Sequence, residues 1–337
     1  MATANSWLDR TPEAVLEPEL PICDPHHHLW EFPTSVYLVE ELLQDLGAGH
    51  NVVKTVYVEC NENYRSDGPT ALAPIGETEF VEQVTRQHQQ QPKIAAGIVG
   101  FADLSLGAAV REVLEAHMQA SSRFRGIRHA SAWHESEKIH NSHTRPCRDL
   151  LQDPLFLAGF QQLQDLGLTF DAWMYFEQIP QLTDLARAFP DIPIVLNHIG
   201  GPIGIGPYTD RREEVFAQWR ANIIELSACE NVYVKLGGMT MTASGFGWHK
   251  LDAPPGSEAL AAAMAPYFHT CIEHFGAERC MFESNFPVDR ASCSYHVLWN
   301  AFKRVSREYS DSDRAKLFHD NACRFYKIQE ANVWGSH

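Results

Sequence analysis

The chain has 337 residues, of which 45% are apolar, and its formal net charge is -16. The length and apolar content predict a large buried core. The acidic balance argues against nucleic acid or an anionic membrane as a partner, since both demand basic patches. An anionic small molecule is not excluded, because it needs only a local Arg or Lys.

The cysteines and the first residues bear on the cellular compartment. Eight cysteines are scattered with no C-x-x-C pair, a pattern typical of neither a zinc ribbon nor a disulfide framework. The first twenty residues hold several charges and no apolar segment of a secretory signal. No apolar run approaches the roughly 18 residues of a membrane span. We therefore expect a cytoplasmic protein, and leave a homo-oligomer open.

Strands and helices alternate along the chain after an N-terminal arm at 1–19. Apolar and β-branched runs predict strands at 20–23, 52–58, 94–101, 124–129, 168–173, 192–198, 232–236 and 279–283. Helices are expected at 36–46, 77–90, 155–166, 179–189, 212–227, 296–309 and 311–319, with one capped by Ser105 and ending near Ser121, and one running from the loop at 239–256 to Phe275.

About eight strands separated by helices favour a (β/α)8 TIM barrel, which would form a single domain over 20–337. Several strands are continuous apolar runs, as expected when helices cover the sheet. A doubly wound open sheet is the competing fold. It is disfavoured because no G-x-G-x-x-G follows an early strand, and we interpret the glycines at 200–204 as a loop.

Three consecutive histidines, His26, His27 and His28, follow the first apolar run. Residues i and i+2 of a strand point the same way, so His26 and His28 can converge on one point. Two neutral imidazoles form half of a metal site. With 17 histidines in the chain, roughly one His-x-His pair is expected by chance, so a surface or capping cluster is the alternative.

Polar residues end seven of the eight predicted strands, where a barrel collects its catalytic groups. They are His26, His28, Glu59, Arg128, His129, Asp171, Trp173, His198, Lys235, Glu283, Asn285 and Asp289. Charged residues often end strands without any functional role. In a barrel, however, all of these residues would lie together at its carboxyl end, the mouth of the barrel.

Five segments carry a resemblance to a protein family. They are His26-x-His28, Gly126-Ile127-Arg128-His129, 197–202 (NHIGGP), 281–289 (MFESNFPVD) and Asn321-Ala322. Together they resemble the amidohydrolase-2 branch of the amidohydrolase superfamily from about 22 to 326. Within that branch the chain is similar to TIM-barrel lactonases for sugar lactones, sulfomuconolactone and pyrone dicarboxylate.

The resemblance implies that His26, His28 and His198 are site histidines. In some members such histidines hold a divalent metal, for which we expect zinc, and in others they bind substrate without metal. The family's last strand usually ends Ser-Asp-x-Pro, where the Asp activates water, but this chain has Asn285. Asn cannot act as a general base. Asp289, Glu283 or a residue elsewhere would replace it.

Other residues are candidates for substrate contacts. Arg128 offers a bidentate fork for a substrate carboxylate or forms a structural ion pair. His129 and Asn285 are expected at the mouth, and Trp173 forms an apolar wall or packs in the core. Glu59 is either a ligand or substrate contact at the mouth, or a core-facing carboxylate paired to Arg or Lys. The loop histidines His134, His140 and His143 are more often solvated.

These residues favour a hydrolase that opens a lactone or related cyclic ester of a small molecule that carries a carboxylate. His198, Arg128 and a carboxylate would activate water and stabilise the oxyanion. Non-oxidative decarboxylation of an aromatic or unsaturated acid is the alternative reaction. A catalytically inactive barrel that binds a ligand is the alternative of another class, and Asn285 is its best support.

Overall fold

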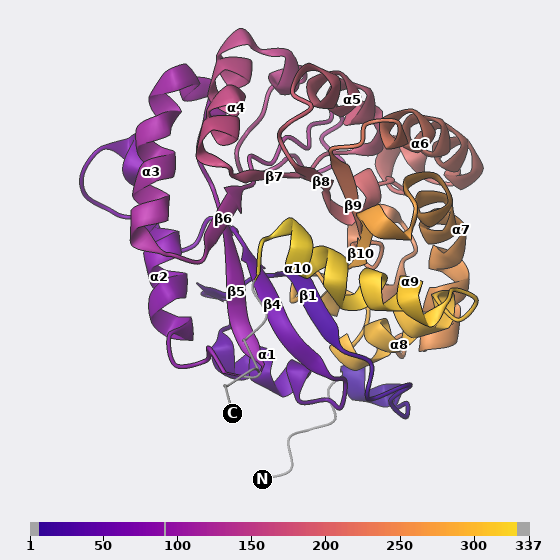
Figure 1. Cartoon of the computed structure of the whole chain (residues 1–337). Coiled ribbons are helices and arrows are strands. Elements are labelled where there is room, and N and C mark those ends of the chain that lie inside the picture. The colour runs from indigo at the N-terminus through magenta and orange to yellow at the C-terminus, as the bar shows by residue number, and fades with distance from the viewer. Residues whose placement is uncertain (1–6, 91, 329–337) are drawn as a thin grey trace.

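The computed structural model describes residues 7–90 and 92–328 (Figure 1). Within these residues, eight parallel strands form one sheet in the order β1-β4-β5-β6-β7-β8-β9-β10. Their bounds are β1 (Ile22–His27), β4 (Val52–Val58), β5 (Lys93–Gly100), β6 (Phe124–Ile127), β7 (Thr169–Ala172), β8 (Ile194–Leu196), β9 (Val232–Leu236) and β10 (Cys280–Phe282). Sequence order equals spatial order, as in a barrel of repeated strand–helix units.

The two ends of the sheet meet. His27 forms a parallel bridge with Phe286, which follows β10. The His28 N–H donates to the Phe286 carbonyl at 2.8 Å, and the Asn285 N–H donates to the His26 carbonyl at 3.0 Å. The predicted (β/α)8 barrel is confirmed, and the open sheet is wrong.

Helices surround the strands as an outer ring (Figure 1). They are α1 (Val39–Leu46), α2 (Ile75–Thr85), α3 (Val110–Ala120), α4 (Pro154–Leu166), α5 (Ile179–Ala188), α6 (Arg212–Ser227), α7 (Ser257–Phe275), α8 (Tyr295–Val305), α9 (Asp311–Ala315) and α10 (Asn321–Phe325). In α4, Phe156, Phe160 and Leu163 share the buried face at helical spacing. The Asp153 carboxylate accepts from the first-turn N–H groups, and left-handed Gly167 ends the helix.

The helices predicted at 77–90 and 296–309 end earlier, at Thr85 and Val305. Three further predicted helices differ for reasons that the contacts show. Residues 36–37 belong to β3 (Ser35–Tyr37), which pairs with β2 (Trp30–Phe32), so α1 begins only at Val39. Ser105 is not the cap, because the Asp103 side chain accepts from the Ser105 N–H. A 3-10 segment follows before α3. The helix at 311–319 is interrupted after α9 by a π-helical turn at Lys316–Asp320.

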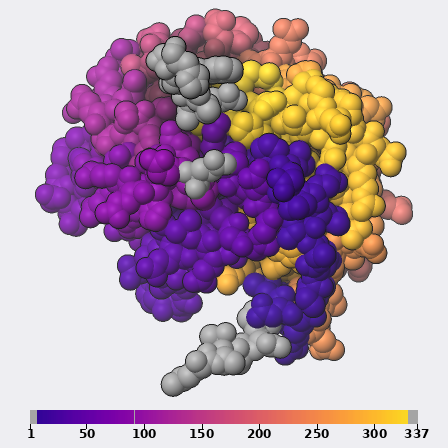
Figure 2. Space-filling model, turned by 60° about the horizontal axis from the view of Figure 1, so that its bottom comes forward, coloured from indigo at the N-terminus to yellow at the C-terminus, as the bar shows by residue number. Residues whose placement is uncertain are grey.

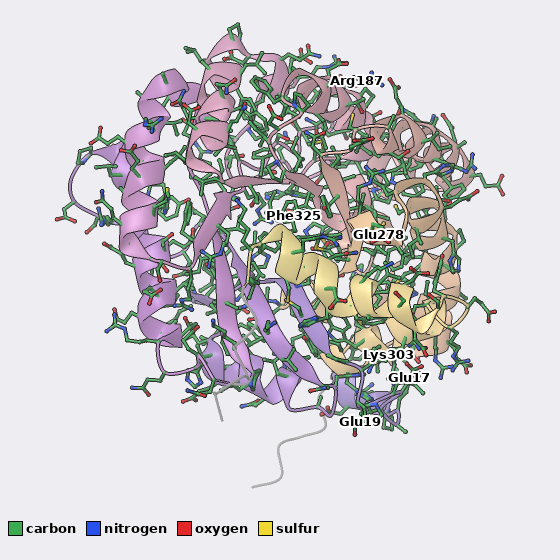
Figure 3. All side chains as sticks on the ribbon, in the orientation of Figure 1. Glu17, Glu19, Arg187, Glu278, Lys303 and Phe325 are labelled. Atoms are coloured by element: carbon green, nitrogen blue, oxygen red, sulfur yellow. The ribbon has the colours of Figure 1, made fainter. Side chains whose placement is uncertain are left out.

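The arm at 1–19 is described from residue 7, and its first six residues lie outside the described part. It is fastened by the Trp7 indole N–H to the Leu251 carbonyl at 2.9 Å, and by Lys303 Nζ to the Glu17 carbonyl at 2.8 Å. Glu17 and Lys303 lie side by side in Figure 3, and Figure 2 shows the indigo N-terminal segment against the orange part of the chain. Residues 329–337 of the predicted domain also lie outside the described residues, so its boundaries stay a prediction.

The C-terminal helix α10 covers the amino end of the barrel (Figure 1). Phe325 and Tyr326 pack into the barrel interior against Cys23, Val56 and Val195. The Tyr326 hydroxyl donates to the Asp171 carboxylate at 2.9 Å. With the amino end filled, the carboxyl end is left for a site. Across the described residues, we find no helix with the length and apolarity that a bilayer span requires.

Candidate active site

Glu283 stands between two histidines at the carboxyl end of the barrel. It follows β10, His26 lies on β1, and His198 lies in the turn after β8. Glu283 Oε2 is 2.7 Å from His26 Nδ1, and Oε1 is 2.6 Å from His198 Nδ1. The His198 backbone N–H also donates to Oε1 at 2.9 Å. All three side chains are buried, so one carboxylate orients two imidazoles.

Both imidazoles are held neutral. Burial lowers the pKa of His26 well below its ordinary value, and the Lys235 ammonium lowers it further. Burial also lowers the pKa of His198, although Glu283 opposes this. Lys235 Nζ is 3.2 Å from His26 Nδ1, and Asp171 compensates its charge at 2.7 Å. Neutral imidazoles are the form that binds metals or accepts protons.

His26, His198 and Glu283 fit a divalent metal ion by donor type. Each offers one ligand atom, and these atoms lie within 4.8 Å of one another. Glu283 Oε2 is buried without a hydrogen-bond partner, although His26 Nδ1 is close to it. Two imidazoles and a carboxylate form an accepted ligand set for zinc. The predicted set was His26, His28 and His198, and the structure brings Glu283 rather than His28 to the other two.

His28 stays in edge contact with His26, with ring centroids 5.0 Å apart, but it is not one of the three residues whose ligand atoms come together. The pairing of β1 with β4 shifts between Asp24 and His27, so the regular i, i+2 alternation is lost. His28 Nδ1 lies 2.8 Å from the Val58 carbonyl, which can only accept, so Nδ1 carries the proton. Burial and Arg128 lower the pKa of His28 to about 3. Its Nε2 is therefore a bare acceptor.

Asn285 also presents a hydrogen-bond acceptor to His28. Its Oδ1 lies 3.4 Å from His28 Nε2, while its amide N–H donates to the Asp289 carboxylate. Both residues line a cavity. Two facing acceptors are stabilised when a ligand donates to both, so this pair suits a substrate hydroxyl.

Asp289 lies behind Asn285 rather than at the cavity. It is fully buried, and its carboxylate accepts from the Thr240 N–H at 3.0 Å and from the Thr240 hydroxyl. Burial raises its pKa to about 7. Asp289 is absent from the cavity lining within the described residues. The geometry fits a residue that orients Asn285 better than the predicted general base.

Arg128 is occupied by Glu59. Arg128 Nε donates to Glu59 Oε1 at 2.7 Å, and Nη2 donates to the Glu59 carbonyl. His143 Nε2 is 3.1 Å from Glu59 Oε2. Burial would raise the pKa of Glu59, but Arg128 and His143 outweigh it and lower the pKa to about 2. Of the two readings of Arg128, the structure shows the ion pair, and its fork is not free for a substrate carboxylate.

The cavity has a volume of about 240 Å³. Its lining includes predicted residues, namely His28, Arg128, Trp173, His198 and Asn285, and residues that the sequence did not single out, namely Trp30, Met241 and Val288. Trp173 lies edge-on to His198 with ring centroids 4.9 Å apart. The loop residue His143 also lines it. His129 does not belong to the lining: it is buried against Phe101 and Phe156.

Known proteins resemble this chain in sequence and in fold. A family model described as "Amidohydrolase" matches residues 23–328. The uncharacterized protein y4mH of Sinorhizobium fredii is 32% identical, covering 92% of this chain and 99% of that protein. An L-fucono-1,5-lactonase of Burkholderia ambifaria is 26% identical, covering 79% and 87%. A zinc-bound amidohydrolase crystal structure from Burkholderia multivorans superposes with a TM-score of 0.71 at 21% identity, covering 91% and 99%.

Proposed function

The chain belongs to the amidohydrolase family, and from this premise we propose that it is a metal-assisted hydrolase that opens a lactone ring. One observation carries the proposal: a single buried carboxylate, Glu283, orients two neutral imidazoles beside a small cavity. The similarity to an L-fucono-1,5-lactonase supports a lactone as the substrate. The zinc bound in a protein of the same fold supports the metal.

His26, His198 and Glu283 would hold the ion. A bound zinc-type ion supplies a water of pKa near 7 and polarises the ester carbonyl. The chain's own residues do the rest. His28 Nε2 and Asn285 Oδ1 accept hydrogen bonds from the substrate, and Asp289 keeps the Asn285 amide turned so that its oxygen faces the cavity.

The charge of the cavity favours a neutral hydroxylated lactone over the carboxylate-bearing substrate that we expected from the sequence. Arg128 and His143 are the basic groups of the lining that lie beside a carboxylate, and both are already paired with Glu59. Seating a substrate carboxylate on Arg128 would require it to compete with a buried carboxylate at 2.7 Å. Acceptors at His28 and Asn285 instead suit the hydroxyl groups of a sugar lactone.

Turnover of a lactone panel tests the proposal. Purified protein, with its metal content measured, would be assayed by acid release on neutral sugar lactones and on lactones that carry a carboxylate. We expect hydrolysis of the neutral set, its loss in Glu283→Gln, and its retention in Glu258→Gln, whose side chain is 82% exposed. Carbon dioxide release from aromatic acids without lactone turnover would establish the decarboxylase instead. Binding without any turnover would establish an inactive barrel.

The metal needs its own measurement. Elemental analysis of the native protein should give about one divalent ion per chain, and Glu283→Gln should lower that content. Full lactone turnover after metal removal, unaffected by a chelator, would support a metal-free mechanism with the same histidines.

A further inference from the structure

A second group of reactive side chains lies at the opposite end of the barrel, where α10 meets β1 and β4 (Figure 1). Cys323 Sγ is 3.4 Å from His319 Nε2 and 3.4 Å from Lys54 Nζ. His319 Nδ1 is 2.8 Å from the carboxylate of Asp320. The fully buried Cys23 packs in the same buried cluster as Cys323. None of these residues lines the cavity described above.

The arrangement stabilises a thiolate at Cys323. Asp320 fixes the His319 proton on Nδ1, so Nε2 can take the proton of the Cys323 thiol, and Lys54 adds a second positive charge. The Cys23 hydrogen bond, followed by His319 and Lys54, lowers the pKa of Cys323 to about 5 against the opposing effect of burial. The pKa of Cys23 is raised well above its ordinary value, chiefly by that same hydrogen bond. One thiol ionises and its neighbour stays protonated.

The turn that presents this group is unusual. His319 and Asp320 lie in the π-helical turn Lys316–Asp320, and Cys323 lies one helical turn later in α10. Single π-turns are rare and occur often at functional sites. The His319 side chain is 13% exposed and Asp320 is 55% exposed, while Cys323 is 9% exposed.

We propose that Cys323 and Cys23 form a peroxide-oxidised thiol pair, with Cys323 as the attacking thiolate and Cys23 as the resolving thiol. The Cys323 sulfur attacks a peroxide oxygen, the S–O bond forms and the O–O bond breaks. The departing hydroxide takes the His319 proton and leaves as water. The Cys23 thiol then attacks the sulfenic sulfur, the S–S bond forms, and the S–O bond breaks with release of a second water. Two thiols are oxidised while one peroxide is reduced.

The exposed Cys147 provides a control within the same chain. Native protein would be treated with hydrogen peroxide between pH 6 and pH 8, and oxidation at each cysteine followed by peptide mass spectrometry. The Cys323 rate should stay nearly flat, because its thiolate is already formed. The rate at the exposed Cys147 should instead increase with pH, because a thiol reacts with peroxide through its thiolate. A Cys323 rate that climbs in parallel with that of Cys147 would overturn the proposal.

The product and two variants test the roles of the other residues. A linked peptide pair joining Cys23 to Cys323 is expected, and Cys23→Ser should stop at a sulfenic acid that dimedone traps. His319→Gln should move the Cys323 rate profile to higher pH, whereas Cys147→Ser should leave it unchanged. Circular dichroism of each variant confirms that it is folded. A sulfenic acid in the native protein that never links to Cys23 overturns the role of Cys23, and with it the proposal.

Discussion

Two buried glutamates divide the mouth of the barrel into unlike halves. Glu59 is held by Arg128 and His143, so its charge is compensated by cations. Glu283 instead faces two imidazoles, of His26 and His198, that burial keeps neutral. In the first half, the carboxylate charge is already paired with basic side chains without a ligand. In the second half it is not, so we expect a ligand or ion to act there and the Glu59 half to support it.

The largest effect should come from replacing Glu283. Glu283→Gln keeps the size of the side chain, but its amide N–H₂ can neither bind a metal ion nor accept a hydrogen bond where the carboxylate can do both. Lactone turnover should fall about a thousandfold, the scale of losing a group that orients several catalytic side chains. Steady-state kinetics and a metal determination would measure it. Near-normal kcat would show that the Glu283 half is not the reacting half.

Replacing Glu59 should lower the stability of the fold more than it lowers turnover. Glu59→Gln removes the negative charge that compensates the buried Arg128 guanidinium, and breaking a buried ion pair costs about 3–5 kcal/mol. Denaturant unfolding should show that loss, with kcat of the remaining folded protein reduced far less than in Glu283→Gln. The two halves would be equivalent if stability were unchanged and turnover were abolished.

Replacing His198 tests whether this imidazole, which Glu283 orients, takes part in the reaction. His198→Ala should lower kcat about a hundredfold, the scale of a lost acid–base or electrostatic group. Folding should change little, as judged by circular dichroism and thermal melting. A variant that turns over normally would remove His198 from the reaction.

Asp289 should matter less than a general base would. Asp289→Asn presents an amide N–H₂ to that of Asn285, which would turn Asn285 and misdirect its oxygen. A loss of about tenfold in kcat is expected for a displaced hydrogen bond. Asn285→Asp should remain folded. If Asp289→Asn instead abolishes turnover, Asp289 is the base that the sequence predicted.

As the pH falls, the stability that depends on the buried neutral histidines should be lost before the stability that depends on ionised Glu59. His28 has a folded pKa of about 3, against about 6.5 when unfolded, so below pH 6.5 the unfolded chain binds the extra proton and stability falls. Glu59, with a folded pKa of about 2, contributes stability that is lost only as pH falls from about 4.3 towards 2. Melting temperature should therefore drop by a few degrees between pH 7 and pH 5. His28→Gln should make this drop smaller without removing it, because the buried His26 and His198 contribute in the same direction, and Glu59→Gln should retain it.

Local patterns predicted the elements well where one physical preference dominates. The strands at 52–58 and 232–236 agree with β4 and β9, and the helix at 212–227 agrees with α6. Residues 36–37 were wrong because pairing with β2 outweighed helix propensity. The cap at Ser105 was wrong because two polar residues compete for the same N–H groups, and local sequence does not decide between them.

Strand ends predicted which residues gather at the mouth but not which of them touch. Glu59 and Arg128 are 69 residues apart, and Glu283 and His198 are 85 apart. Their contacts depend on strand register around the barrel and on His198 and Asn285, which adopt φ of 54° that non-glycine residues seldom adopt. The register shift in β1 before His27 also leaves no local signal in the sequence.

The barrel closes at the same place where the site is assembled. The backbone bonds that join the first strand to the last run between 26–28 and 285–286, the very segments that carry the histidines and the amide. A ribosome must therefore deliver some 285 residues before any of these groups can meet, and a half-barrel fragment holds no part of the reaction. We therefore expect turnover only from a completely synthesised chain. A truncated or nicked chain whose first and last strands stay unpaired should be inactive rather than partly active.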